Sequence, residues 1–243
     1  MAFIDKSKPI PLYYQLVEII NGQIARKELG AGDKLPTEQW FSQNYDISRV
    51  TVRKALEELI QSGAIERVRG KGPVVASPKL NRKLSRLTGL HEEITESGYQ
   101  STSLISDIEY KQAEGAIARH LHTADGEPVV TFRRLRCLDE VPFADQMIYL
   151  RTKFCENFDP KELETSSLYQ ILENRYKLTI DYADQTLGIK APTKKQLEDL
   201  HLTSPSPLLR MRRTTYLNTG DVVEYTEISY VPDRYELSMR LYR

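Results

Sequence analysis

Two arginines and a threonine lie close together in the chain, at Arg49, Thr51 and Arg53. An arginine can donate two hydrogen bonds at once to O6 and N7 of a guanine, and a threonine hydroxyl can contact a base or a phosphate. A helix presents such side chains when its N-terminal end enters the major groove of DNA. The alternative that these residues alone leave open is a solvated helix with two surface arginines.

The flanking residues predict a helix that begins after Ser48, whose hydroxyl can accept a hydrogen bond from a free backbone N–H of the first turn. Apolar residues recur behind it at the spacing of one helix face, at Val52, Ala55, Leu56 and Leu59. Arg49, Thr51 and Arg53 fall off that face, at the N-terminal end of the helix. The pattern therefore exposes the polar side chains and buries the apolar ones.

A second arginine pair, Arg134 and Arg136, stands two residues apart on a predicted strand. Side chains at that spacing point to the same face of a sheet. Their forked donors could converge on one anion, either a phosphate or a carboxylate. The alternative is that both arginines are exposed or paired with acids.

A helix is predicted over residues 89–97, with Thr88 as its N-cap. A helix N-terminus is a natural anion site because its first backbone N–H groups have no partner within the helix. Here those groups belong to Gly89, Leu90 and His91.

Four side chains further along the chain could complete such an anion site: Ser167, Tyr169, Glu224 and Tyr230. Ser167 and Tyr169 could add hydroxyl groups from a later helix. Glu224 could bind sugar hydroxyls or an amine, and a surface ion pair is an equal alternative for a single acid. Tyr230 fits a core position at least as well as a ligand contact.

Three helices and a hairpin must position the first group of residues. The first helix opens at Pro11, carries Leu12, Leu16, Ile20 and Ile24 on one face, and is expected to end at Gly30 and Gly32. Thr37 caps a short second helix with Trp40 and Phe41 as core anchors, and Gly63 stops the third helix. Two β-prone runs, 65–68 and 73–76, are joined by Arg69-Gly70-Lys71-Gly72, which permits a tight hairpin with a basic tip. An ordinary β-turn with incidental charges is the alternative for the hairpin, but after three helices the pattern predicts a winged helix-turn-helix.

Four motifs follow one another in this part of the chain: Pro11-Leu12-Tyr13, Gly32-Asp33-Lys34-Leu35-Pro36-Thr37-Glu38, Ser48-Arg49-x-Thr51-Val52-Arg53-x-Ala55-Leu56-x-x-Leu59, and Gly70-Lys71-Gly72. In order and spacing, residues 11–76 resemble the DNA-binding domain of the GntR family of bacterial transcription regulators. Gln39 departs from the arginine that the family usually carries there, which puts one DNA contact in doubt. Pro73-Val74-Val75 replaces Thr-Phe-Val after the wing glycines and should stiffen the wing without abolishing it. The DNA-binding residues that the resemblance implies are Lys34, Thr37, Gln39, Ser48, Arg49, Thr51, Arg53, Arg69, Gly70, Lys71 and Gly72.

Charge is distributed unevenly although the formal net charge of the chain is zero. Residues 1–76 carry net +2, residues 77–88 carry net +4 with no acid, and the remainder carries net −6. A basic front and an acidic rear suit a DNA-binding domain with a separate control domain. We therefore expect a winged helix-turn-helix over 1–76, a basic linker over 77–88 and an effector-binding and dimerisation domain over 89–243. The linker is either a plain solvated connection or a segment that touches phosphates beside the operator.

Composition narrows the class of protein further. The chain has 243 residues, of which 40% are hydrophobic, and no apolar run approaches membrane-spanning length. Its N-terminus lacks the apolar core of a signal peptide. Cys137 and Cys155 are isolated, and the close pair His120 and His122 has no third ligand nearby, so neither a disulfide scaffold nor a metal site is expected. No cofactor is expected, and the cytoplasm is the expected compartment.

The rear half mixes strand and helix signals. Strands are predicted over 103–110, 129–138, 143–150, 178–189, 207–218 and 222–231, and helices over 89–97, 113–121, 166–175 and 193–200. Long β-runs separated by short turns indicate an antiparallel sheet with helices packed on it. The fold class is therefore α+β in two domains, and the strands argue against the GntR branch that has an all-helical rear domain.

Three runs in the rear half carry a looser resemblance: Arg134-Leu135-Arg136, Ser166-Ser167-Leu168-Tyr169 and Val223-Glu224-Tyr225-Thr226-Glu227. They resemble the effector-binding UTRA domain of the HutC-like branch, which is related in fold to chorismate lyase. Gln146 stands where that branch often carries an acid, which makes a ligand with an amino group less favoured. The expected effector-binding residues are Leu90, His91, Arg134, Arg136, Gln146, Ser167, Tyr169, Glu224 and Tyr230.

These features together predict a transcription regulator, with repression favoured over activation. It would bind double-stranded, near-palindromic operator DNA as a homodimer and be released by a small anionic effector, first a phosphorylated sugar and second an organic acid. The alternative is an enzyme of chorismate-lyase-like fold with a DNA-binding head. The sequence offers that alternative no nucleophile-base pair, no suitably spaced carboxylates and no metal cluster, and kinship of fold does not carry function.

Overall fold

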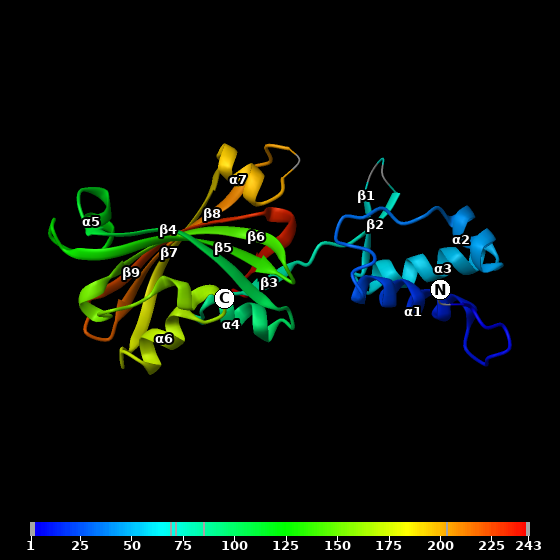
Figure 1. Cartoon of the computed structure of the whole chain (residues 1–243), viewed down its shortest axis with the longest axis horizontal. Coiled ribbons are helices and arrows are strands. Elements are labelled where there is room, and N and C mark those ends of the chain that lie inside the picture. The colour runs from blue at the N-terminus through cyan, green and yellow to red at the C-terminus, as the bar shows by residue number, and fades with distance from the viewer. Residues whose placement is uncertain (1–2, 69, 71, 85, 203, 242–243) are drawn as a thin grey trace. The chain divides into compact units, whose positions relative to one another are not determined.

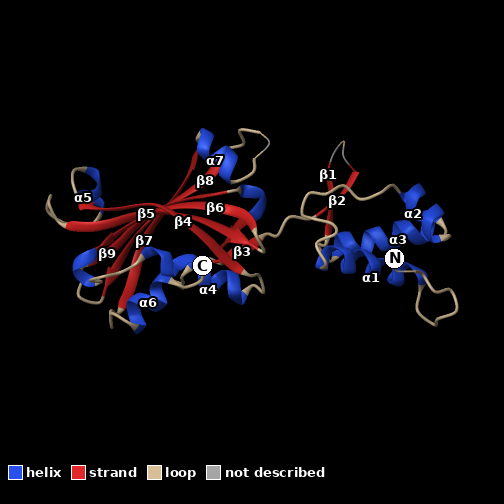
Figure 2. Ribbon diagram, in the orientation of Figure 1, coloured by secondary structure: helices blue, strands red, loops and turns tan. Residues whose placement is uncertain are grey.

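The computed structural model describes residues 3–68, 70, 72–84, 86–202 and 204–241, and the chain divides into two compact units, Met1–Ser77 and Pro78–Arg243 (Figure 1). Helices and a short hairpin form the first, the front unit (Figure 2). The second, the rear unit, is a sheet with helices packed on it. The predicted α+β class with two domains is confirmed.

The described residues of the front unit form α1 (Leu12–Ala25), α2 (Glu38–Tyr45), α3 (Arg49–Gln61), β1 (Ile65–Val68) and β2 (Gly72–Val75). Both predicted N-caps are present: Thr37 Oγ1 accepts from the backbone N–H of Trp40, and Ser48 Oγ accepts from that of Thr51, each at 3.1 Å. β1 and β2 pair antiparallel as the wing hairpin. Arg69 and Lys71, the expected cations of its tip, lie outside the described residues.

The front core forms where the apolar faces of the three helices meet. Its fully buried members include the predicted stripe of α3 together with residues from α1 and α2: Leu16, Ile20, Phe41, Val52, Ala55, Leu56 and Leu59. The predicted end of α1 at Gly30 is wrong, because the helix already ends at Ala25. The chain leaves the helical conformation there, with Lys27 in the left-handed region at φ 58°.

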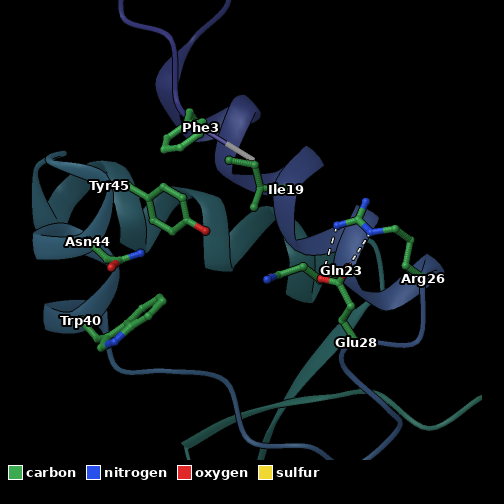
Figure 3. Close-up of a pocket in the computed structure, with 8 residues that line it drawn as sticks. All are labelled: Phe3, Ile19, Gln23, Arg26, Glu28, Trp40, Asn44 and Tyr45. Carbon is green, nitrogen blue, oxygen red and sulfur yellow. Dashed lines mark hydrogen bonds and ion pairs between the residues drawn. The ribbon is translucent and has the colours of Figure 1, made fainter. Parts of the chain in front are cut away.

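Trp40 is not the core anchor that the sequence predicts. Phe41 is buried, whereas Trp40 remains 45% exposed. Trp40 instead lines a cavity of about 610 Å³ between α1 and α2, opposite Ile19 and beside Tyr45, with the ion pair of Arg26 and Glu28 at its edge (Figure 3). Successive residues of a helix face different directions, and Phe41 takes the inward one.

The rear unit contains, in chain order, β3 (Leu80–Lys83), α4 (Leu90–Glu96), β4 (Ser101–Gln112), α5 (Ala116–His120), β5 (Pro128–Leu138), β6 (Val141–Arg151), the 3-10 turns η1 (Thr152–Phe154) and η2 (Pro160–Glu164), α6 (Leu168–Asn174), β7 (Ile180–Lys190), α7 (Lys194–Asp199), β8 (Leu208–Leu217), β9 (Val222–Tyr230), η3 (Pro232–Arg234) and β10 (Tyr235–Ser238). Six of these strands form an antiparallel sheet in the order β4-β5-β6-β9-β8-β7. Each of the six overlaps a strand predicted from the sequence.

The helices divide between the two faces of this sheet (Figure 1). α4 and α6 cover one face, where Tyr169 of α6 bonds Thr215 of β8. α5 and α7 lie on the other, where His120 stacks on Tyr225 and Gln196 bonds Asp145. Because alternate residues of a strand face opposite sides, the face under α4 and α6 receives Arg134 and Arg136 but not Arg133.

The expected linker over 77–88 is partly a strand. Leu80–Lys83 pairs in parallel with β10, near the C-terminal end of the chain, and Leu80 is fully buried in the rear unit. Arg82, counted in the sequence as one of four linker cations, is also buried and forms an ion pair with Glu93 of α4 at 2.9 Å. The sequence could not reveal this, because a four-residue strand paired to a distant segment leaves no local periodicity.

None of the helices in the described part of the chain is long and apolar enough to cross a membrane.

Candidate functional site

Side chains from two helix starts and four strands line a pocket on the face of the sheet that α4 and α6 cover. They are Gly89, Leu90, His91, Arg134, Arg136, Gln146, Ile148, Ser167, Leu168, Tyr169, Arg213, Glu224, Thr226, Ile228 and Tyr230. All nine predicted effector-binding residues are among them. The free volume at their centre is only about 30 Å³, so side chains fill most of the pocket in this structure.

Strand register explains why residues so distant in sequence meet here. Arg134 lies opposite Gln146, and Gln146 lies opposite Ile228 on the next strand. Thr226 in turn lies opposite Arg213. The inward-facing residues therefore form two neighbouring rows on one face of the sheet. These rows lie between two apolar clusters that form under α4 and under α6.

Arg134 is 2% exposed and has its guanidinium fixed by three hydrogen bonds. It donates to Ser103 Oγ at 2.9 Å, to the Ser166 carbonyl at 3.0 Å and to the Leu163 carbonyl. Burial holds the pKa of Arg134 well below its ordinary value, and the neighbouring charge of Arg136 lowers it further. Its hydrogen-bond partners are neutral oxygens, so the positive charge has no direct counter-ion among the described residues.

Arg136 is 1% exposed and less completely bonded. One Nη atom donates to Ser101 Oγ at 2.9 Å, whereas Nε has no partner in the described part of the chain. Burial lowers the pKa of Arg136 to about 10. The alternative that these two arginines are exposed or ion-paired is therefore wrong, since both are buried and neither forms an ion pair within the described residues.

A hydrogen-bonded chain links three further ionisable groups of the pocket, Arg213, Tyr169 and Glu224. Arg213 donates to the Tyr169 hydroxyl at 3.2 Å, that hydroxyl bonds Thr215 Oγ1 at 3.0 Å, and Thr215 donates to Glu224 at 3.2 Å. Glu224 is 2% exposed, which excludes the surface ion pair considered for it. Burial raises the pKa of Glu224 against the opposing charges of Arg213 and Arg134. Three guanidinium groups thus share the pocket with one carboxyl group, which leaves a surplus of positive charge.

Two polar residues of the pocket, Arg213 and Thr226, were not predicted from the sequence. Arg213 follows Arg212 in a strand, and only the register shows which of the two faces inward. Arg212 faces the other side and bonds Glu227 at 2.8 Å. The alternation of the strand could have suggested one inward arginine, but not its proximity to Tyr169.

Buried polar atoms without partners concentrate in this pocket. Within the described residues they include His91 Nδ1, Arg136 Nε, Gln146 Oε1 and the Tyr230 hydroxyl. Buried polar groups normally find a partner, so each such atom calls for a water or a ligand. The set offers both donors and acceptors, which suits a ligand with an anionic group and several hydroxyls.

The start of α4 differs from the prediction. Gly89, not Thr88, is the N-cap, and the Thr88 hydroxyl donates to the Glu93 carboxylate. Glu92 accepts from the Gly89 backbone N–H at 3.2 Å and from Ser167 Oγ at 2.8 Å. An acid therefore already occupies part of the helix start, and the buried arginines are the stronger anion-binding feature.

The histidines and cysteines are possible metal ligands by type, but their surroundings in the described part of the chain do not suit that role. No group of three or more His, Cys, Asp or Glu residues that could hold a metal ion occurs among the described residues. His120 stacks on Tyr225 at 4.1 Å between ring centroids, and His122 packs edge-on against Tyr216. Cys155 is buried, which raises the pKa of its thiol to about 12.

The front unit presents a second, exposed group of polar residues. Ser48, Arg49 and Arg53 are exposed at the start of α3, and Lys34, Thr37 and Gln39 are exposed at and before the start of α2. Arg53 donates to Glu38 at 3.2 Å, and the Thr51 hydroxyl bonds that of Ser48 at 2.8 Å. Gly70 and Gly72 of the wing adopt φ values of 82° and 86°, which favour glycine. Basic and hydroxyl side chains at one helix end beside a hairpin are the features of a winged DNA-binding surface.

Comparison with known proteins covers both units. Residues 12–75 match the family described as bacterial regulatory proteins, gntR family, and residues 96–236 match the UTRA domain. The chain is 30% identical to the HTH-type transcriptional repressor NagR of Bacillus subtilis over 96% of its length and 95% of that protein. It is 28% identical to the mannosyl-D-glycerate transport/metabolism system repressor MngR of Escherichia coli, over 94% of this chain and 95% of MngR.

A solved structure shows the same fold. PhnF from Mycobacterium smegmatis superposes with a TM-score of 0.68 at 22% identity, covering 95% of this chain and 98% of PhnF. NagR and MngR are transcriptional repressors, and the enzyme alternative finds no support in them.

Proposed function

Because this chain belongs to the GntR family of bacterial DNA-binding transcription regulators and carries a UTRA domain, we propose that it is a repressor whose rear unit binds a small anionic effector. Two chains pair as a homodimer and place two copies of α3 in successive major-groove faces of a near-palindromic operator, in the cytoplasm. The residues proposed for DNA contact are those predicted from the sequence, with Arg49 and Arg53 as the base-contacting arginines. Effector binding lowers the affinity for the operator.

The surplus of buried guanidinium charge is the observation that carries the effector proposal. A buried charge without a counter-ion costs free energy, and a bound anion removes that cost. Arg134 and Arg136 present planar forks that suit phosphate or carboxylate oxygens. A phosphorylated sugar fits best, because its anionic end meets the arginines while its hydroxyls meet Gln146, Glu224 and Tyr230.

Relatives support the sugar part of this proposal. The name of MngR refers to mannosyl-D-glycerate, a sugar joined to a carboxylate. The compound combines a sugar with a carboxylate, so an organic acid remains the second candidate for the effector of this chain.

The small free volume of the pocket suggests how effector binding could reach the front unit. Known ligand pockets measure roughly 300–1,000 Å³, so a sugar phosphate needs more room than this pocket offers, and a movement of α4 or α6 would provide it. α4 is tied to β3 by the buried ion pair of Glu93 and Arg82. β3 begins three residues after Ser77, where the front unit ends. A shift of α4 that carries β3 with it would therefore move the segment that connects the two units. The effector thus selects one of two dimer geometries by binding it more tightly.

Thermal unfolding of the full chain with a panel of sugar phosphates, amino-sugar phosphates and small carboxylic acids tests the effector proposal. A ligand at a hundred times its dissociation constant should stabilise the protein by about 2.7 kcal/mol. Arg136→Met should lose this gain, since it removes the charge at similar length. Arg136→Lys is the matched control, which keeps the charge without the fork and should retain part of the gain.

Two results would count against the effector proposal. One is a ligand that stabilises wild type and Arg136→Met equally, since it would bind elsewhere. The other is a panel in which no anion stabilises the wild-type protein, which would give the buried arginines a structural role only.

A further inference from the structure

Val50 is the apolar residue of α3 that the front core does not use. It lies between Arg49 and Thr51 in the first turn, and its side chain is 77% exposed. Exposing an apolar side chain brings the fold no stability, and the other large apolar residues of α3's first two turns are buried. The exposed side chain of Val50 is therefore available to contact a binding partner.

Helix geometry places Val50 directly away from the core. At about 100° per residue, it lies roughly opposite the buried stripe formed by Val52, Ala55, Leu56 and Leu59. The two cationic neighbours on the same side are drawn away from it. Arg53 bonds Glu38 of α2, and the Lys54 ammonium lies 4.0 Å above the ring of Tyr13 in α1. Val50 is left bare between them at the N-terminal end of the helix.

An apolar side chain in this position has one chemical match in the major groove. The base edges there present hydrogen-bond donors and acceptors, and the 5-methyl group of thymine is the one apolar feature among them. We propose that Val50 is a specificity-determining residue that packs on the 5-methyl group of one thymine in each half-site. The inference rests on the proposed placement of α3 in the major groove, and it adds an A·T preference that the arginines cannot supply.

Exchange of thymine for uracil tests this contact, because it removes only the methyl group. Full-length protein first selects its preferred duplex from a random pool, and each thymine of that duplex is then replaced by uracil in turn. For the wild type, one position per half-site should weaken binding about fourfold, the value of one buried methyl group. Val50→Ala removes the contact from both half-sites, so it should weaken binding to the thymine duplex by roughly 16-fold, the square of that factor. It should also lose most of the penalty for uracil at that position.

The variant is suited to the test, since alanine favours the helix more than valine does and should leave the fold intact. Val50→Ala should also leave the slope of log affinity against log salt unchanged, because it removes no phosphate contact. Arg49→Ala is the matched control from the adjacent position: it removes a proposed base-contacting arginine, so it should relax specificity at a guanine and leave the uracil penalty unchanged.

Three outcomes would overturn the proposal, and they are distinguishable. If uracil has no effect at any position, no thymine methyl group is contacted. If the uracil penalty is the same in Val50→Ala, another residue makes the contact. If no sequence is selected from the pool, sequence-specific DNA binding fails, and the Val50 proposal fails with it.

Discussion

The arginines of the front unit and those of the rear unit have opposite surroundings. Arg53 of α3 has a side chain that is 58% exposed, whereas Arg82, Arg134 and Arg136 are buried in the rear unit. An exposed arginine keeps its water and can exchange partners at little cost. A buried arginine has lost its water and is held by groups fixed in the fold, so it contributes a permanent positive field.

Two ion pairs make this difference concrete. Arg53 and Glu38 pair at 3.2 Å with side chains 58% and 34% exposed, and Arg82 and Glu93 pair at 2.9 Å with side chains 3% and 9% exposed. The first is a surface pair that bases or phosphates of DNA can replace. The second cannot be exchanged for solvent, and it joins β3 to the helix whose start lines the pocket. Under the proposed function, the exposed pair of Arg53 is available for recognition, and the buried pair of Arg82 serves connection within the rear unit.

The largest expected effect comes from breaking the buried pair. Arg82→Met should lower the free energy of unfolding of the rear unit by about 3–5 kcal/mol, because it leaves the Glu93 carboxylate buried without its partner. Denaturant unfolding followed by a rear-unit probe measures the change. Burial already raises the pKa of Glu93 against the opposing charge of Arg82, so the loss should be smaller at pH 5 than at pH 8.

A double variant separates lost charge from lost packing. Arg82→Met combined with Glu93→Leu should recover most of the stability, since no uncompensated charge remains. The recovered protein should then respond less to effector, because α4 is no longer tied to β3 through a directed bond. Equal loss in the single and double variants would contradict the importance of the pair.

A smaller effect, on a different quantity, is expected at the exposed pair. Arg53→Ala should cost about 1–3 kcal/mol in operator binding, the value of one good bidentate contact to a base. Its stability should change by less than about 1 kcal/mol, because surface pairs contribute little. Binding measured at fixed salt, beside thermal unfolding, separates the two. Unchanged operator affinity would refute the assignment of Arg53 as a base-contacting residue.

The sequence predicted the front unit and the rear unit for different reasons. Caps and apolar spacing are local, so Thr37, Ser48 and the α3 stripe could be located from a few neighbouring residues. In the rear unit, strand alternation alone predicted that Arg134 and Arg136 face the same side of the sheet. The pocket residues collected through the family resemblance, such as Ser167 and Glu224, do line one cavity.

What the sequence could not predict depends on register and distant pairing. Arg213 belongs to the pocket only because β8 and β9 pair in one register. β3 exists only because a segment near the other end of the chain pairs with it, which turned an expected linker cation into a buried ion-pair partner. Trp40 and Phe41 are adjacent, large and aromatic, so residue type alone could not tell which one faces the core.

The smallest expected effect tests whether burying the ionised carboxylate of Glu224 in the pocket lowers the free energy of unfolding. Burial raises the pKa of Glu224, so folding favours the protonated form of this carboxyl group. A group whose pKa is raised on folding makes stability fall as pH rises from the ordinary carboxyl range through the raised pKa. Glu224→Gln imitates the neutral form and should therefore be more stable than wild type above that range, with the difference shrinking at lower pH. Thermal unfolding from pH 4 to pH 8 checks this, where a gain of ~1 kcal/mol would appear as roughly 2–4 °C in Tm. If Glu224→Gln were instead the less stable protein at pH 8, Arg213 and Arg134 would already compensate the charge of Glu224, and the positive surplus that the effector proposal needs would be smaller than three guanidinium groups suggest.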